Sequence, residues 1–386
     1  MDKKKILLVS LGHLSCDING GALPAVLPFL RSAYGLSYQA TGGLMFAYSC
    51  LSSLIQPLFG LLADRFSKPW FIPLGVLLAG GGLALVGFMT GYWAIFCAIV
   101  VSGVGAALFH PEGARFANKV SGRQKGTGLS LFSIGGNSGF VLGPLLATAV
   151  LSVFGLHGTA IFAAIALTMA SLLLTLIWRM RAPAGEGGGA IVAEAPGVNN
   201  WPEFSKLTMA IVARSILFAG FNTFVPLYWV NVLGQSRTAG ALALTFFCTC
   251  GVISNFFGGL LSDKYGYRTI IRLAYALVAP VVLAFSLADN VYAAWAVLPF
   301  LGFTLYAPFS SLVVLGQQYL AKNIGFASGV TLGLATSLGG VMAPLLGWIA
   351  DHQGLPRAFQ CLAAVALLGA VFAYALKPVA KEGQTE

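Results

Sequence analysis

Charged residues are scarce in this chain of 386 residues. Only 9% are Asp, Glu, Lys or Arg, whereas 58% are hydrophobic. An average soluble domain carries about 25% charged residues, and a soluble fold with so few would expose apolar surface and aggregate. The shortage excludes an ordinary soluble enzyme, a disordered protein and a nucleic-acid-binding domain. What remains is an integral membrane protein, in which each span needs roughly 20 apolar residues.

The sequence also lacks the motifs of several kinds of chemistry. It has no G-x-x-x-x-G-K-[ST] phosphate loop, so ATP does not drive a cycle directly. It has no His, Cys and carboxylate set at metal-ligand spacing and no G-x-S-x-G nucleophile turn. We therefore expect no cofactor, no bound metal and no enzymatic activity. The six cysteines all lie in apolar segments and are interpreted as small buried hydrophobes.

The apolar runs predict twelve membrane-spanning helices. The first six cover 6–30, 41–63, 70–89, 92–115, 126–153 and 159–179, and the second six cover 205–233, 239–261, 268–287, 291–317, 325–350 and 357–376. With a cytoplasmic N-terminus, 18 of the 22 Lys and Arg fall on the cytoplasmic side, and only Arg31, Arg237 and Arg357 fall outside. This asymmetry follows the positive-inside rule. It predicts a multi-pass membrane protein with both termini in the cytoplasm.

The chain divides into two halves that repeat each other. Residues 181–203 are rich in Gly, Ala and Pro and predict a flexible cytoplasmic linker between an N-terminal bundle (1–180) and a C-terminal bundle (204–386). Gly60-Leu-Leu-Ala-Asp64 matches Gly259-Leu-Leu-Ser-Asp263, and Pro144-Leu-Leu matches Pro344-Leu-Leu, at offsets of about 200. Parallel six-helix repeats are typical of one large class of transporters.

Several segments carry a family resemblance. Gly60-x-x-x-Asp64-Arg65-x-x-Lys68 resembles the cytoplasmic loop signature of the major facilitator superfamily, and the segment from Gly139 to Pro144 resembles its antiporter motif. Three further segments are similar to the fosmidomycin-resistance group of exporters: His13-Leu-Ser-Cys-Asp17, the run 109–115 and the run 135–139. The resemblance implies an all-α integral membrane fold of twelve transmembrane helices in two pseudo-symmetric six-helix bundles.

The resemblance also gives two motifs a mechanical role. It implies a conformational latch made by Gly60, Asp64, Arg65 and Lys68 and by their second-half copy Asp263, Lys264 and Arg268. The alternative is that these cations only set the topology. It also implies that a bend at Gly139, Gly143 and Pro144 shapes the interface between the halves and favours exchange over leak. An ordinary kink of a membrane helix is the alternative.

Asp17 is the most informative single residue. It lies near the middle of the first span, where a carboxylate costs on the order of 3 kcal/mol to insert. It must therefore face a cavity, be paired or be protonated. His13 shares its helical face at i, i+4 and can share a proton with it. We interpret Asp17 and His13 as a proton-coupling site, with a structural polar bridge between helices as the alternative.

Arg214 lies deeper inside a predicted span than any other cation. A guanidinium needs a partner or water there. Three interpretations are open: Arg214 faces Asp17 from the other half, it binds an anionic group of a substrate, or it extends to the cytoplasmic interface. Further polar and aromatic residues are candidates for lining a substrate cavity: Asn137, Asn222, Tyr48, Gln56, Tyr228, Trp229 and Tyr306.

His110, Glu112 and Arg115 lie near the cytoplasmic end of the fourth span. Glu112 and Arg115 are three residues apart and can pair. The three residues make a cytoplasmic gate, or alternatively an interfacial salt bridge beside a helix break at Pro111.

Together these features predict a secondary transporter. The resemblance supplies the direction and the ion: a proton-coupled antiporter that exports a small organic solute or drug, such as a phosphonate-like anion, by alternating access. A proton-coupled importer of a small organic anion and a membrane receptor that moves nothing are the alternatives. We expect a monomer in the lipid bilayer whose partners are a small-molecule substrate and protons, with no nucleic acid.

Overall fold

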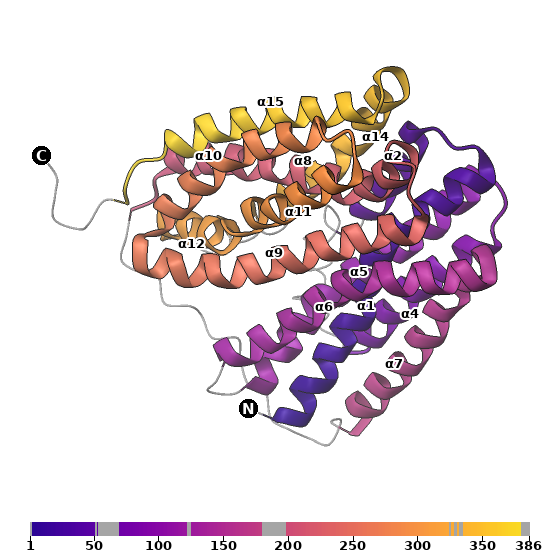
Figure 1. The fold of residues 1–386 in the computed structure, drawn as a ribbon. Coiled ribbons are helices and arrows are strands. Elements are labelled where there is room, and N and C mark those ends of the chain that lie inside the picture. The colour runs from indigo at the N-terminus through magenta and orange to yellow at the C-terminus, as the bar shows by residue number, and fades with distance from the viewer. Residues whose placement is uncertain are drawn as a thin grey trace, which may run out of the picture. The chain divides into compact units, whose positions relative to one another are not determined.

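The computed structural model describes residues 2–50, 52, 69–121, 125–179, 198–323, 326–327, 330–331 and 335–379. Every regular element among these residues is a helix (Figure 1). The first half contains α1 (Lys3–Tyr34), α2 (Tyr38–Ser49), α4 (Phe71–Leu85), η2 (Val86–Phe88), α5 (Tyr92–Ser121), α6 (Lys125–Phe154), η3 (Gly155–Thr159) and α7 (Ala160–Arg179). The second contains α8 (Trp201–Asn231), α9 (Arg237–Tyr265), α10 (Tyr267–Ser286), α11 (Val291–Tyr306), α12 (Phe309–Tyr319), α14 (Ala335–Gln353) and α15 (Leu355–Tyr374).

The helices follow the predicted spans closely. Each of the twelve predicted spans contains at least one helix. Among the described residues, nine helical segments are long and apolar enough to cross a membrane. The span predicted over 291–317 is divided, because α11 ends at Tyr306 and α12 begins after Pro308. Proline has no backbone N–H to continue the helical hydrogen bonds.

The contacts between residues group the chain into two compact units. Unit 1 comprises Met1–Gly185 with Asn222–Thr245 and Ala343–Asp351. Unit 2 comprises Glu186–Phe221, Phe246–Met342 and His352–Glu386. The division predicted from the sequence, with a linker at 181–203, stays a prediction, since residues 180–197 lie outside the part of the chain that the structure describes.

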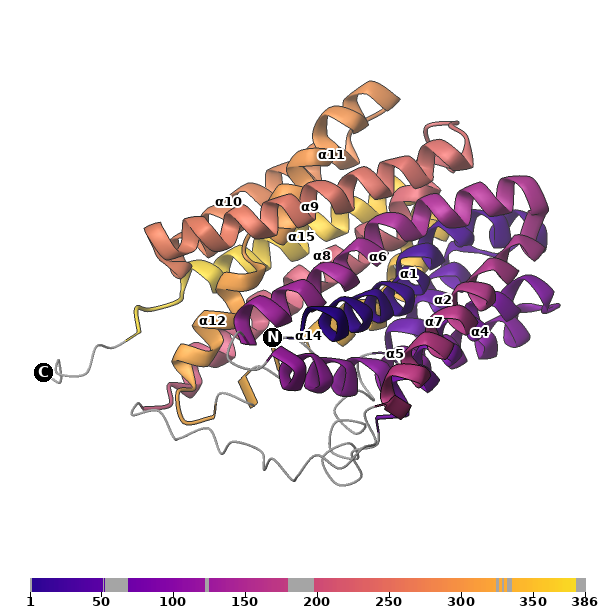
Figure 2. The same cartoon turned by 90° about the horizontal axis from the view of Figure 1, so that it is seen from below.

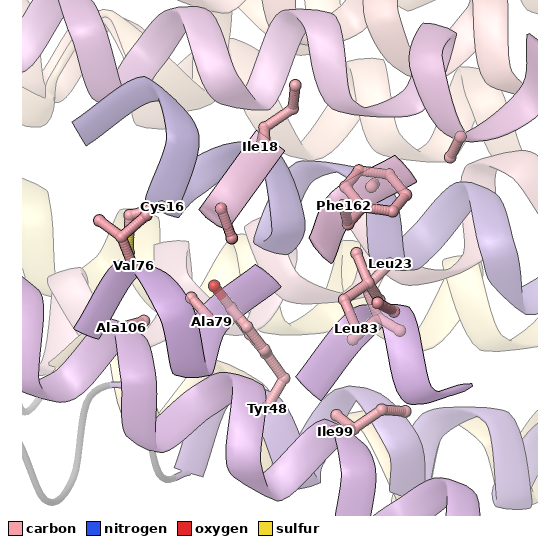
Figure 3. Packing of buried hydrophobic residues seen from close by; sticks show 14 of the residues in the cluster. Cys16, Ile18, Leu23, Tyr48, Val76, Ala79, Leu83, Ile99, Ala106 and Phe162 are labelled. Carbon is pink, nitrogen blue, oxygen red and sulfur yellow. The ribbon is translucent and has the colours of Figure 1, made fainter. Parts of the chain in front are cut away.

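The core of unit 1 is built on α1. This helix runs beside α6 in both views of the fold (Figures 1 and 2), while α4 packs between α5 and α7. Buried side chains of α1, α2, α4, α5 and α7 meet in one apolar cluster (Figure 3). Figure 3 labels members of that cluster: Cys16, Ile18, Leu23, Tyr48, Val76, Ala79, Leu83, Ile99, Ala106 and Phe162.

Glycines let α6 lie directly on the backbone of α1. A Cβ atom on Gly139 would be 2.6 Å from the backbone nitrogen of Ile18, and one on Gly143 would be 2.5 Å from that of Ala22. Small residues allow this close approach between membrane helices. Two of the three residues predicted to form a helix kink thus have a packing role within unit 1, beside the buried Pro144.

The last turns of α14 hold the first turn of α2, also within unit 1. Asp351 accepts hydrogen bonds from the backbone N–H groups of Tyr38 (2.7 Å) and Gln39 (2.8 Å). Those N–H groups have no partner inside α2, and a carboxylate at a helix N-terminus is electrostatically favourable. The backbones also touch nearby, since a Cβ on Gly42 would lie 2.4 Å from the carbonyl oxygen of Ala343.

In unit 2, α10 is the helix around which others pack. It contacts α11, α12 and α15, and its Tyr275 hydroxyl donates to the carbonyl of Ala210. Arg272 of α10 donates to the carbonyls of Tyr374 (2.6 Å) and Leu376 (2.8 Å) at the end of α15. A cation at a helix C-terminus satisfies carbonyls that have no partner inside the helix.

Candidate functional site

Two histidines converge on the carboxylate of Asp17 inside unit 1. The Nε2 atom of His110, on α5, lies 2.9 Å from Asp17 Oδ1. The Nε2 atom of His13, one turn before Asp17 on α1, lies 3.1 Å from Oδ2. Asp17 is 6% exposed and His13 is 9% exposed. The mid-span carboxylate is therefore paired on both oxygens, one of the arrangements that the sequence predicts for it.

Backbone carbonyls fix the orientation of both imidazole rings. His13 Nδ1 lies 2.7 Å from the carbonyl oxygen of Phe132, and His110 Nδ1 lies 2.7 Å from that of Ala106. A carbonyl oxygen only accepts hydrogen bonds, so each Nδ1 carries the hydrogen. Both Nε2 atoms are left to face the carboxylate.

Aromatic packing and a glycine complete the cluster. The His13 ring stacks on Phe132 of α6, with ring centroids 4.0 Å apart, and meets the edge of the His110 ring at 5.2 Å. A Cβ on Gly136 would be 2.5 Å from His13 Nε2 and 2.7 Å from Asp17 Oδ2. Only a residue without a side chain fits at position 136 beside these atoms.

The same three residues are the group of described residues that could hold a metal ion, since their ligand atoms lie within 4.8 Å of one another. Carboxylate and imidazole are common metal ligands. However, each of these atoms already has a hydrogen-bonding or ion-pair partner inside the cluster. The three side chains therefore satisfy one another inside unit 1.

The sequence places His110 in a cytoplasmic gate, and its contact with Asp17 is not foreseen there. The two residues are 93 positions apart, so neither helical periodicity nor motif spacing could join them. The pair predicted at i, i+3 is present, because Arg115 Nη1 lies 3.9 Å from Oε1 of the buried Glu112. Whether these residues form a gate stays a prediction.

Arg214 forms a second polar site, in unit 2. Its side chain on α8 is 5% exposed, and Nη1 donates to the carbonyl of Leu305 at 3.2 Å. The guanidinium lies 5.1 Å from the ring centroid of Phe309. Its Nε is buried with no hydrogen-bond partner. Among the described residues no carboxylate lies within 4.0 Å of it. The side chain thus stays inside the protein instead of extending to the interface.

Aromatic side chains form the surroundings of this arginine. Tyr306 at the end of α11 packs against Phe218 with ring centroids 5.3 Å apart, and its hydroxyl lies 3.8 Å from Cys248 Sγ. Ser310, the residue after Phe309, donates to Asn255 Oδ1 at 2.9 Å, so a neutral polar pair follows the aromatic ring in the chain. A guanidinium beside aromatic rings and neutral polar groups suits an organic anion.

The other predicted cavity residues are placed as follows. In unit 1, the Tyr48 hydroxyl lies against Gly20 of α1, Asn137 is half-buried on α6, and Asn222, Tyr228 and Trp229 are buried on α8. Gln56 lies outside the described residues. Their contact with a substrate stays a prediction.

One copy of the predicted latch can be described. Asp263, near the end of α9, accepts a hydrogen bond from the Tyr267 hydroxyl at 2.9 Å, and Lys264 lies 5.2 Å from the ring centroid of Tyr265. Arg268 is half-buried in the first turn of α10. The first-half copy, made by Gly60, Asp64, Arg65 and Lys68, lies outside the described residues.

Comparison with known proteins identifies the class. Residues 9–344 match the family model of the Major Facilitator Superfamily, and the chain belongs to this superfamily. It is an all-α, multi-pass membrane transporter of the major facilitator fold and not an enzyme. The fold also matches the crystal structure of a bacterial homolog of the human lysosomal transporter Spinster, with a TM-score of 0.82, 16% identity and 96% of each chain covered.

Three individual relatives match most of the chain. The fosmidomycin resistance protein of Escherichia coli (strain K12) is 30% identical over 94% of this chain and 90% of its own length. The uncharacterized MFS-type transporter YfnC of Bacillus subtilis (strain 168) is 28% identical over the same shares. The quinolone resistance protein NorA of Staphylococcus aureus is 23% identical over 89% of each chain.

Proposed function

We propose that the protein is a proton-coupled antiporter that exports a small organic solute, with an anionic drug of the fosmidomycin type as the leading candidate. Two relatives, a fosmidomycin resistance protein and a quinolone resistance protein, support export of antibacterial compounds. We place it in a bacterial inner membrane with both termini in the cytoplasm, since 18 of its 22 cations then lie on the cytoplasmic side.

The observation that carries the proposal is the buried carboxylate of Asp17 between two imidazoles. Histidine is the side chain whose ordinary charge change falls near neutral pH, which suits it to accept and release protons. A proton that enters from outside loads this cluster, the transporter changes conformation and the proton leaves to the cytoplasm. The substrate moves in the opposite direction.

The second part of the proposal concerns the substrate and rests on Arg214. Its buried guanidinium is paired with a single backbone carbonyl, and its Nε lacks a partner. A phosphonate or carboxylate would pair with it in the forked geometry that arginine favours. The substrate is therefore an organic anion, and the aromatic rings beside Arg214 accommodate its apolar part.

The test is transport into proteoliposomes, with fosmidomycin as the first probe. Asp17→Asn keeps the size and polarity of the side chain but cannot carry a proton. It should abolish accumulation driven by a proton gradient and leave counterflow of the probe intact. Asp289→Asn is the matched control, because Asp289 is exposed and, among the described residues, its side chain bonds only to Asn290. Normal gradient-driven accumulation in Asp17→Asn would refute proton coupling through Asp17.

Two further assays separate the alternatives. Comparison of inverted and right-side-out vesicles distinguishes an exporter from an importer, because only an exporter accumulates the probe in inverted vesicles. Counterflow distinguishes either one from a receptor, which would bind the probe without exchanging it.

A further inference from the structure

We propose that unit 1 carries a binding site for an anionic phospholipid of the surrounding bilayer, in a cavity where α1 and α6 end and α9 begins. The cavity has a volume of about 520 Å³, which lies within the usual range for pockets that bind organic ligands. All of its lining residues belong to unit 1, whereas Arg214 belongs to unit 2. The inference therefore goes beyond the proposed transport and does not depend on it.

The cavity lies at the depth at which a lipid headgroup meets a membrane protein. Its last residue on α1 is Ala33, one position before the end of that helix, and its last residue on α6 is Ser152, two positions before the end. Arg237 and Thr238 are the first two residues of α9. The ends of membrane-spanning helices lie near the boundary between hydrocarbon and headgroups.

The surface beside the cavity is apolar. Val153 and Phe154 follow the cavity residue Ser152, and they are 73% and 67% exposed. Exposed apolar side chains at the end of a membrane-spanning helix are in contact with lipid. A lipid that enters the cavity from the bilayer covers this surface with its acyl chains, whereas a small hydrophilic anion from water leaves it uncovered. The exposed apolar pair therefore favours a lipid.

The lining of the cavity suits both parts of an amphiphile. Leu151 and Leu156 give it apolar surface. The hydroxyl groups of Ser32, Ser152 and Thr238 can donate hydrogen bonds to phosphate oxygens. The lining therefore fits a molecule that has an apolar chain and an oxygen-rich head.

Arg237 gives the site its preference for negative charge. Its guanidinium lies 4.7 Å from the ring centroid of Phe29, a contact that holds the cation at the cavity. Among the described residues no carboxylate lies within 4.0 Å of Arg237, and no acidic residue lines the cavity. The start of α9 adds partial positive charge. A phosphate would pair with the planar fork of this arginine.

The other two cations predicted to lie outside the cytoplasm are placed differently. Nη1 of Arg31 donates to Asn231 Oδ1 at 3.4 Å, and Nη1 of Arg357 donates to Gln360 Oε1 at 2.9 Å. Neither arginine lines the cavity. Arg357 is exposed and belongs to unit 2, so it is the matched control for Arg237.

Native mass spectrometry of the full-length protein in detergent tests the site. We would measure the affinity for phosphatidylglycerol and for phosphatidylcholine with the same acyl chains. Phosphatidylglycerol should bind more tightly, and Arg237→Gln should weaken its binding about 3- to 10-fold while leaving phosphatidylcholine unaffected, because one cation at an anionic lipid surface is lost. Arg237→Lys should keep part of the affinity. Arg357→Gln should change neither lipid.

A second variant tests the cavity itself. Ser152→Trp fills the cavity at an exposed position, so it should weaken the binding of both lipids. Unchanged binding of both lipids in this variant would show that they bind elsewhere. Equal affinity of Arg237→Gln and the unsubstituted protein for phosphatidylglycerol would likewise overturn the site.

Competition distinguishes a lipid from a free anion. Sodium phosphate should displace phosphatidylglycerol no better than sodium chloride at the same ionic strength. Selective displacement by phosphate would overturn the lipid assignment and show a site for soluble anions. No transport is measured in these experiments, so their failure and a failure of the proposed antiport can be told apart.

Discussion

At the scale of single residues, Arg214 is the clearest case of an interaction that the protein leaves incomplete. Among the residues that the structure describes, no carboxylate lies within 4.0 Å of its guanidinium, and a buried cation without a counter-charge costs free energy. Its one hydrogen bond goes to a neutral carbonyl, which does not neutralise the charge. A substrate anion would neutralise that charge.

The corresponding prediction concerns affinity for anionic substrates. Arg214→Gln should raise the KM for an anionic probe about 10- to 100-fold, since hydrogen bonds to charged groups contribute about 1.5–3 kcal/mol. Arg214→Lys should recover only part of this, because an ammonium lacks the planar fork. The measurement is initial uptake rate against probe concentration, with the exposed Arg357→Gln as control. An unchanged KM in Arg214→Gln would show that the anion binds elsewhere.

At the scale of helices, the contact between α1 and α6 determines the geometry around Asp17 and His13. The two helices touch backbone to backbone, and α6 supplies the carbonyl of Phe132 that orients His13. A shift of α6 by a few tenths of an ångström would alter that hydrogen bond. The packing of the helix pair and the orientation of the imidazole are thus coupled.

Glycine substitutions test this coupling. Gly139→Ala places a Cβ 2.6 Å from the backbone nitrogen of Ile18, and such overpacking lowers the free energy of unfolding by about 1–3 kcal/mol. Gly81→Ala in α4 meets nothing within 4 Å and should be neutral or slightly stabilising, because alanine favours helix. Thermal unfolding in detergent compares the two. Equal melting temperatures would contradict the close packing.

A second contact between helices is the pair of hydrogen bonds that Asp351 of α14 accepts at the start of α2. Asp351→Asn removes the charge that favours the N-terminus of α2, an effect of about 0.3–2 kcal/mol. We expect maleimide to label the variant Thr41→Cys about 2- to 10-fold faster when Asp351→Asn is also present, because Thr41 is 0% exposed while this contact holds. The native cysteines are replaced in both backgrounds. An equal labelling rate with and without Asp351→Asn would show that these hydrogen bonds do not limit the exposure of position 41.

At the scale of the whole molecule, hydropathy and charge predict the fold because the bilayer imposes both. Every predicted span contains a helix, since an apolar run of that length has few other stable conformations in lipid. The contact of Asp17 with His13 is predictable for a similar reason: it lies within one helix, where spacing alone decides which residues meet.

Contacts between distant segments could not be predicted in this way. His110 reaches Asp17 only through the packing of α5 on α1, and Asp351 reaches Tyr38 across 313 positions. The role of Gly139 and Gly143 was equally hidden, because small residues and proline in a membrane helix fit a kink as well as a close helix contact. Each of these features depends on which faces of two helices meet.

The lack of space for a side chain at Gly136 has an evolutionary consequence. Any larger side chain there would overlap His13 and Asp17, so this position has no room to vary under selection. Aromatic side chains such as Phe309 lie near Arg214, and we expect exchanges among them to be tolerated more readily. Laboratory selection for resistance to new compounds should therefore collect its substitutions around Arg214 and leave position 136 untouched.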